Sequence, residues 1–240
     1  MSTIGGTAVR GSDVVAAMPF AAGSRDEVLA QSQRPAEAFT GTDALARALA
    51  SQAPWIWLLG DRVRPRPDAL EQLLDQARPG DERPASLLAG MVLDAAGAAV
   101  APALPAGGGR ELADVVRLAG RSLLPIRHAP FANCLVAREC FIGEGFPQRS
   151  RYGRYAPVEW TARVLRTRDG YFVPASVVVS DGGTGRRDGL TSIPALARMA
   201  RSGTWTRGET LAAARALAGQ VIGGARAPAR GPGAAGWRAA

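Results

Sequence analysis

An aspartate and three arginines directly follow the most apolar short run of the chain. Residues 55–59 read Trp-Ile-Trp-Leu-Leu, and residues 60–66 read Gly-Asp-Arg-Val-Arg-Pro-Arg. A carboxylate that follows a buried strand lies at the edge where α/β sheets bind ligands. Guanidinium groups recognise phosphate oxygens through paired hydrogen bonds. These residue types make Asp61, Arg62 and Arg64 candidates for binding a phosphorylated ligand, although Asp61 is equally well explained as a turn residue.

Three other side chains are candidates for chemistry. Glu159 could accept a proton, but a carboxylate early in a helix is also stabilised by the helix dipole. Trp160 could stack on a sugar or belong to the core. His128 is the only histidine of the chain and lies in an expected loop before a strand, where a structural role competes with a catalytic one.

Alternating strands and helices must position these residues. The helix expected after Asp68 carries Leu70, Leu73, Leu74 and Ala77 on one face, at helical spacing. Such an alternation of strands and helices predicts a mixed α/β sheet. The expected strands are residues 12–18, 55–59, 86–93, 131–136 and 171–179, with 27–29 as a weaker candidate, and the further helices are 42–51, 138–141 and 158–167.

Length and composition predict one globular domain over residues 1–222. Its last element is an amphipathic helix over 207–222, and the Gly, Ala, Pro and Arg residues of 223–240 predict a disordered basic tail. No apolar run is long enough to span a bilayer, and the N-terminus lacks a signal-peptide pattern, so we expect a cytoplasmic protein. Cys134 and Cys140 are expected to be reduced and buried.

The net charge of +8 raises the question of an anionic partner. All 29 basic residues are arginine, and they are scattered along the chain. Nucleic-acid binders usually concentrate charge on one face or arm, so nucleic-acid binding is disfavoured. The basic tail leaves contact with nucleic acid or with an anionic membrane surface as an alternative reading.

Residues 55–70 resemble the segment "WIWLLDDDxxPxPDAL" of family 2 glycosyltransferases. Two further blocks occur in the order and spacing of that family, at residues 128–147 and 155–179. The closest similarity is to the actinobacterial rhamnosyl- and galactofuranosyl-transferase branch. The resemblance implies a GT-A-like three-layer α/β sandwich with a mostly parallel, mixed sheet. It also implies a nucleotide-diphosphate sugar as donor and a glycan as acceptor.

The chain departs from this family at the positions that carry chemistry. Gly60, Asp61 and Arg62 stand at the Asp-x-Asp motif that holds the metal in the family, and Pro157 stands at the position of the catalytic base. We therefore expect no metal site and no Mg²⁺ or Mn²⁺ cofactor, with arginine contacting the phosphate instead. Glu159 is the acid that remains near the base position.

The resemblance leads to two functional expectations. The first is a glycosyltransferase-like protein of the cell envelope with weak or absent turnover, in which Asp61, Arg62 and Arg64 bind the donor. Glu159 would then be catalytic, and Trp160 and His128 would contact the acceptor. The second is a pseudo-glycosyltransferase that binds a glycan or a partner transferase at the inner face of the membrane.

Overall fold

The computed structural model describes residues 10–18, 25–60, 62–77, 84–97, 99, 104–105, 122–181 and 201. The chain divides into two compact units, residues 1–185 and 186–240. All described residues except Arg201 belong to the first unit. The division at residue 185 falls inside the predicted domain 1–222. The predicted helix 207–222 and the predicted tail 223–240 lie outside the described residues.

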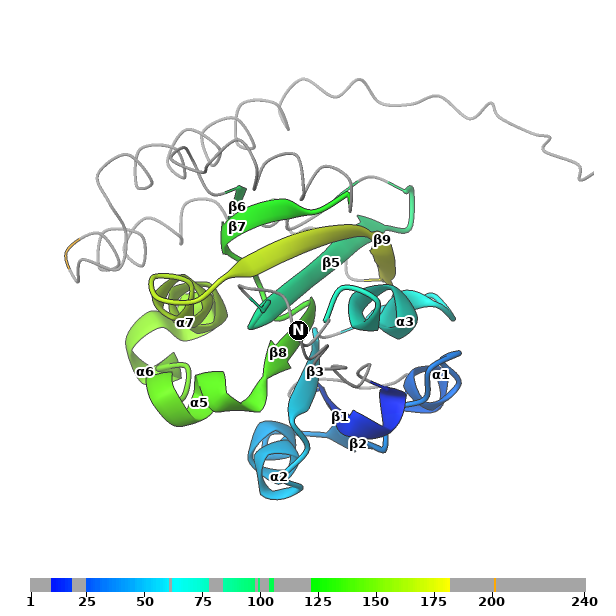
Figure 1. Ribbon diagram of the computed structural model, residues 1–240, viewed down its shortest axis with the longest axis horizontal. Helices are drawn as coiled ribbons and strands as arrows, with labels where there is room; N and C mark the ends of the chain where they lie inside the picture. The colour runs from blue at the N-terminus through cyan, green and yellow to red at the C-terminus, as the bar shows by residue number, and fades with distance from the viewer. Residues whose placement is uncertain are drawn as a thin grey trace, which may run out of the picture. The chain divides into compact units, whose positions relative to one another are not determined.

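Three parallel strands form the first half of the sheet. They are β1 (Val14–Met18), β2 (Glu37–Thr40) and β3 (Trp55–Leu59), connected by α1 (Arg25–Leu29) and α2 (Ala44–Ala50), while a short 3-10 turn, η1 (Gly11–Asp13), precedes β1. β1 is buried along its whole length and pairs in parallel with β2 on one side and β3 on the other. The chain therefore reverses its direction of travel across the sheet at β1 (Figure 1).

The second half of the sheet is mixed. The full strand order is β2-β1-β3-β8-β5-β9-β7-β6, and β4 pairs with the far end of β9. β8 is antiparallel to both of its neighbours, so β1, β2, β3, β5 and β9 all run the same way. The strands are β4 (Val63–Pro65), β5 (Leu87–Asp94), β6 (Leu104–Pro105), β7 (Leu124–His128), β8 (Asn133–Ala137) and β9 (Gly170–Ser180). The predicted α/β class with a mostly parallel, mixed sheet is confirmed.

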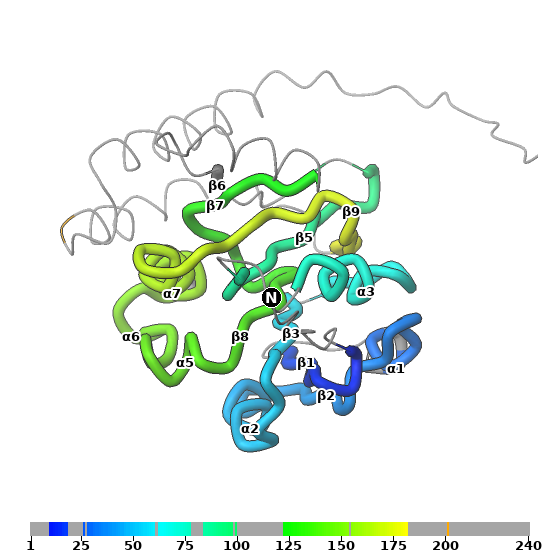
Figure 2. Tube along the Cα trace, in the orientation of Figure 1, coloured from blue at the N-terminus to red at the C-terminus, as the bar shows by residue number. Residues whose placement is uncertain are grey.

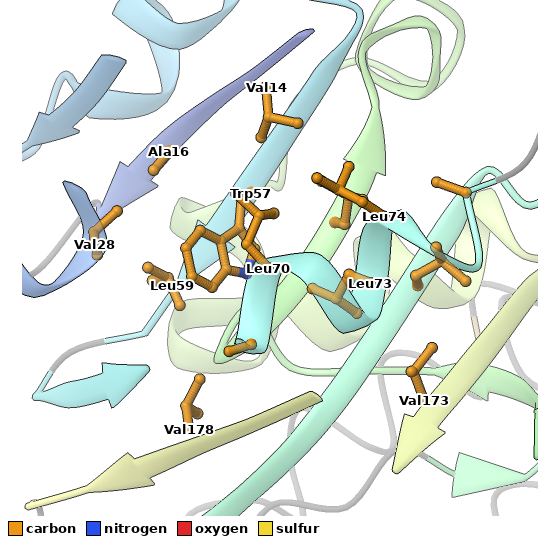
Figure 3. Close-up of a cluster of buried hydrophobic side chains, with 14 of the residues drawn as sticks. Val14, Ala16, Val28, Trp57, Leu59, Leu70, Leu73, Leu74, Val173 and Val178 are labelled. Carbon is orange, nitrogen blue, oxygen red and sulfur yellow. The ribbon is translucent and has the colours of Figure 1, made fainter. Parts of the chain in front are cut away.

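Helices cover both faces of this sheet because its strands are apolar on both sides. α1 and α3 (Ala69–Leu74) pack on one face, and α2, α5 (Arg138–Glu144) and α7 (Ala156–Val164) pack on the other (Figures 1 and 2). α6 (Arg149–Tyr152) and the 3-10 turn η2 (Gly153–Tyr155) connect α5 to α7. Figure 3 shows the first core, in which Leu70 of α3 lies beside Trp57.

Local chemistry explains where the elements differ from expectation. The strand predicted at 27–29 is wrong, because these residues belong to α1. α7 begins two residues earlier than predicted, since Pro157 lies in its first turn, where a proline costs no helical hydrogen bond. The short strands β2, β4 and β7 were not predicted. β4 contains a proline and lies off the main strand order, paired only with β9, where a missing N–H is tolerated. Pro125 is the second residue of β7, which lies between β9 and the two-residue strand β6.

Both cysteines are buried free thiols, as expected. Burial raises the pKa of Cys134 from 9.0 to about 12 and that of Cys140 from 9.0 to about 11. Both thiols are therefore protonated in the folded state at pH values where they would ionise in the unfolded chain. Among the described residues, no helix combines the length and the apolar character needed to cross a membrane.

The two thiols predict a loss of stability in alkali. Because the folded pKa lies above the unfolded value, each thiol stabilises the fold fully below about pH 9, and this contribution declines as the pH rises toward the folded pKa. Between pH 8 and pH 10.5 we expect each thiol to remove about 2 kcal/mol from the free energy of unfolding. Urea unfolding of the natural protein and of Cys134→Val at both pH values measures this. An equal fall in the two proteins would contradict the prediction.

Candidate functional site

The carboxyl edge of the sheet is the first place to look for a ligand site. In open α/β sheets, ligands bind outside the carboxyl ends of the strands, at the point where the strand order reverses. Here that point lies between β1 and β3. β3 ends at Leu59, and the chain turns through Gly60 to Arg62 and enters β4. Asp61, one of the predicted ligand-binding residues, lies outside the described residues.

Three exposed arginines alternate with two buried residues in the segment that follows. Arg62 precedes β4, Arg64 lies within it and Arg66 follows it, whereas Val63 and Pro65 are buried. We call Arg62, Arg64 and Arg66 the arginine row. Its first member has a positive φ of 53°, which places it in the turn before the strand.

One arginine of the row forms an ion pair, and the other two form none with a described residue. Arg64 Nη2 donates to Asp181 Oδ1 at 2.5 Å, across the pairing of β4 with β9. Neither Arg62 nor Arg66 forms a side-chain hydrogen bond or ion pair with any residue that the structure describes. Among the described residues, no acid neutralises these two guanidinium groups, whereas Asp181 already pairs with Arg64, which lies between them in the chain.

A cavity of about 430 Å³ opens beside the arginine row. Its walls are Ala30 and Gln31 after α1, residues 64–67 around β4, and Val179 of β9. Gln31 is buried, and its Oε1 accepts a hydrogen bond from the Leu70 N–H at 3.3 Å. The volume lies within the range of small-molecule sites, and apolar walls with a few polar groups are typical of them. The sequence-predicted Arg64 thus borders a ligand-sized space.

Gly60 is fixed by close packing at the end of β3. Its N–H donates to the Ala132 carbonyl oxygen at 3.1 Å, and a Cβ added there would lie 3.1 Å from Ala132 Cα. Any side chain at position 60 would require the neighbouring backbone to shift by a few tenths of an ångström. Among the described residues, no three His, Cys, Asp or Glu side chains gather closely enough to hold a metal ion.

Glu159 belongs to a buried ion pair on α7. Its Oε1 accepts a hydrogen bond from Arg163 Nε at 3.2 Å, and Arg163 Nη1 lies 3.6 Å from Glu144 Oε2. Oε2 of Glu159 is buried and has no hydrogen-bond partner in the described part of the chain. The Glu159–Arg163 pair lies within α7, and Arg163 connects it to Glu144 at the end of α5. The catalytic role of Glu159 stays a prediction.

Trp160 is a core residue. Its side chain is fully buried, its ring stacks on Phe141 with 4.3 Å between centroids, and Phe131 packs edge-on at 5.4 Å. Its Nε1 donates to the Gly145 carbonyl oxygen at 2.6 Å. The indole has no exposed face on which a sugar could stack, so the acceptor-binding assignment of Trp160 is corrected to a structural one.

His128 and the arginine row lie toward opposite ends of β9. Val63 pairs with Ser180 at the last residue of β9, whereas β7 pairs with its first residues and runs beyond them to His128. β9 has eleven residues, so its ends are roughly 30 Å apart at about 3.3 Å per residue. The structure does not bring the predicted acceptor residue His128 together with Arg62 or Arg64.

A buried polar network, which sequence reasoning missed, supports the carboxyl edge. Trp57 Nε1 donates to Asn133 Oδ1 at 2.9 Å, and Asn133 Nδ2 donates to Ser176 Oγ at 3.0 Å. Ser176 Oγ in turn donates to the Ala69 carbonyl oxygen at 2.8 Å. The network connects β3, β8, β9 and α3. The only feature of the sequence that could have indicated this network is Asn133, the single polar residue of the otherwise apolar strand β8.

Asp181, the ion-pair partner of Arg64, was also missed, although it is an acid two residues after the last predicted strand, 171–179. The site as a whole consists of an arginine row, a cavity with apolar walls and a rigid polar support beneath the sheet edge. Comparison with known proteins assigns it no family: no protein-family model and no curated protein matches the chain.

Proposed function

We propose that this chain is a glycosyltransferase family 2-like protein of GT-A-like fold that binds a nucleotide-diphosphate sugar through its arginine row. The observation that carries the proposal is the pair Arg62 and Arg66, which are exposed at the carboxyl edge without an ion pair to any described residue. Arg66 lines a ligand-sized cavity, together with Arg64. The similarity of residues 55–70 to the family's donor-binding segment supports the same ligand class.

Arginine can replace a metal at a diphosphate for a physical reason. A guanidinium presents donors in a planar fork that matches two phosphate oxygens, and it is always charged at neutral pH. Arg64, held by Asp181, keeps the segment in place, while Arg62 and Arg66 are the groups that contact phosphate. The apolar cavity walls, including Pro65 and Pro67, can pack against the uncharged part of the ligand.

The residues near α7 favour binding with weak or absent turnover. Glycosyl transfer needs a base to take the proton of the acceptor hydroxyl. Pro157, in the first turn of α7, has no proton-accepting side-chain group. Glu159 is buried, and its Oε1 accepts a hydrogen bond from Arg163. We therefore propose donor binding as the retained property. Binding of a cell-envelope glycan or of a partner transferase is the second candidate function. Pro157 and Glu159 favour it as well, because neither supplies an accessible base for sugar transfer.

Isothermal titration with UDP-, GDP- and dTDP-sugars, each with Mn²⁺, with Mg²⁺ or with EDTA, tests the proposal. We expect one donor to bind equally well in EDTA. The double variant Arg62→Gln/Arg66→Gln should weaken binding about a hundredfold, because it removes two charge-assisted contacts.

The matched control is Arg166→Gln, which removes an exposed arginine from the turn after α7. It should bind the donor as the natural protein does. Strictly metal-dependent binding, or an equal loss in both variants, would refute phosphate recognition by the arginine row. Folded protein that binds no donor would shift the assignment to the second candidate function.

A further inference from the structure

The cavity beside the arginine row has a wall that is largely apolar. Among the residues that line it, Ala30, Pro65, Pro67 and Val179 have apolar side chains. The two prolines have a fixed φ and no backbone N–H, so they hold their part of the wall in place and offer no donor to a ligand. This side of the cavity is therefore rigid and poor in hydrogen-bonding groups.

Backbone groups of the same wall already form hydrogen bonds within the protein. The Arg66 N–H donates to the Val177 carbonyl oxygen at 3.0 Å, and the Arg66 carbonyl oxygen accepts a hydrogen bond from the Ala69 N–H at 3.0 Å. The Pro67 carbonyl oxygen accepts one from the Ser32 N–H at 2.8 Å. A sugar hydroxyl or the edge of a nucleobase placed against this wall would lose its water without gaining a full set of new partners, which opposes binding.

Arg66 supplies the cavity with a positive charge. It lines the cavity, it is exposed, and no acid in the described part of the chain pairs with it. Arg64 lines the cavity as well, but its Nη2 already donates to Asp181. A ligand that complements this cavity has one anionic group for Arg66 and an apolar body for the rest of the wall.

We propose that the cavity binds a phosphate ester whose organic part is an apolar chain. The phosphate accepts paired hydrogen bonds from the Arg66 guanidinium, and the chain packs against Ala30, Pro65 and Val179. A cavity of about 430 Å³ is large enough for such a ligand. This ligand is additional to the nucleotide sugar of the proposed function, with which it shares only the phosphate contact of Arg66.

Isothermal titration of the full chain with n-butyl, n-hexyl and n-octyl phosphate tests the proposal. We expect the affinity to rise about fourfold for each CH₂ group that enters the cavity. Octyl glucoside, which has the same chain but no charge, should bind about tenfold more weakly than octyl phosphate or worse. Arg66→Gln should weaken all three phosphates by a similar factor of about ten and keep the dependence on chain length. Ala30→Trp, which places a large ring at the cavity wall, should remove that dependence.

Arg166→Gln and Ala46→Trp are the matched controls, because they make the same changes at exposed positions outside the cavity, in the turn after α7 and on α2. Both should bind the alkyl phosphates as the natural protein does, and circular dichroism should show all variants folded. Equal affinity for butyl and octyl phosphate, or an equal loss in Ala30→Trp and Ala46→Trp, would overturn the proposal. Nucleotide-sugar binding in EDTA without any dependence on chain length would overturn this inference alone, whereas the reverse result would support it and remove only the proposed function.

Discussion

Replacing Asn133 by alanine is expected to lower the free energy of unfolding by about 4 kcal/mol. The side chain is buried and makes hydrogen bonds to Trp57 Nε1, to Ser176 Oγ and to the Ser176 carbonyl oxygen. Alanine would leave these groups without their partner inside the core, and each buried orphan costs about 1–3 kcal/mol. Urea unfolding followed by circular dichroism measures the loss.

Gln72→Ala is the control for Asn133→Ala. It removes a side-chain amide that donates a 3.5 Å surface hydrogen bond to Asp68 Oδ2. We expect a change within about 0.5 kcal/mol, as for most surface substitutions. A double-mutant cycle with Ser176→Ala should give a coupling energy of about 1 kcal/mol or more, since the two side chains share a network. A loss below 1 kcal/mol for Asn133→Ala would show that the network adds little to stability.

Replacing Gly90 by alanine is expected to destabilise the fold by about 3 kcal/mol or more. A Cβ at this position of β5 would lie 2.0 Å from Asn133 Nδ2 and 2.6 Å from the Ser176 carbonyl oxygen. The Ser176 carbonyl oxygen accepts a hydrogen bond from buried Asn133 Nδ2, so moving it away would break a contact of the buried network. It lies where the pairing of β9 with β5 shifts register, between Gly90 and Met91. Thermal unfolding, together with the yield of soluble protein, measures the effect.

Gly143→Ala provides the comparison for Gly90→Ala. The nearest atom to a Cβ at Gly143 is Arg168 Nη2, at 3.6 Å, and the residue lies in α5. Alanine favours helix over glycine by up to about 1 kcal/mol, so this variant should be as stable as the natural protein or slightly more so. If both glycine variants lost stability equally, the close approach of the Asn133–Ser176 network to Gly90 would not be the cause.

The sequence predicted the elements that depend on local pattern. Continuous apolar runs placed strands at 55–59, 86–93 and 131–136, and the helical spacing of Leu70, Leu73 and Leu74 placed α3. Apolar spacing within a short segment shows whether one or both faces of that segment are buried. It depends only on residues that are close in sequence, so it can be read without the fold. The arginines after residue 59 were likewise visible as a candidate phosphate-binding group.

The tertiary structure alone decided which residues meet. It placed Gln31 and Val179 around the cavity beside Arg64, buried Trp160 completely, and set His128 at the far end of β9. Strand order and register depend on contacts between segments that lie tens of residues apart, and a local pattern contains no information about them. For this reason the sequence by itself determined the α/β class and the cationic character of the β3–β4 segment. The cavity, the Arg64–Asp181 pair and the Asn133 network exist only because the folded chain brings distant residues together.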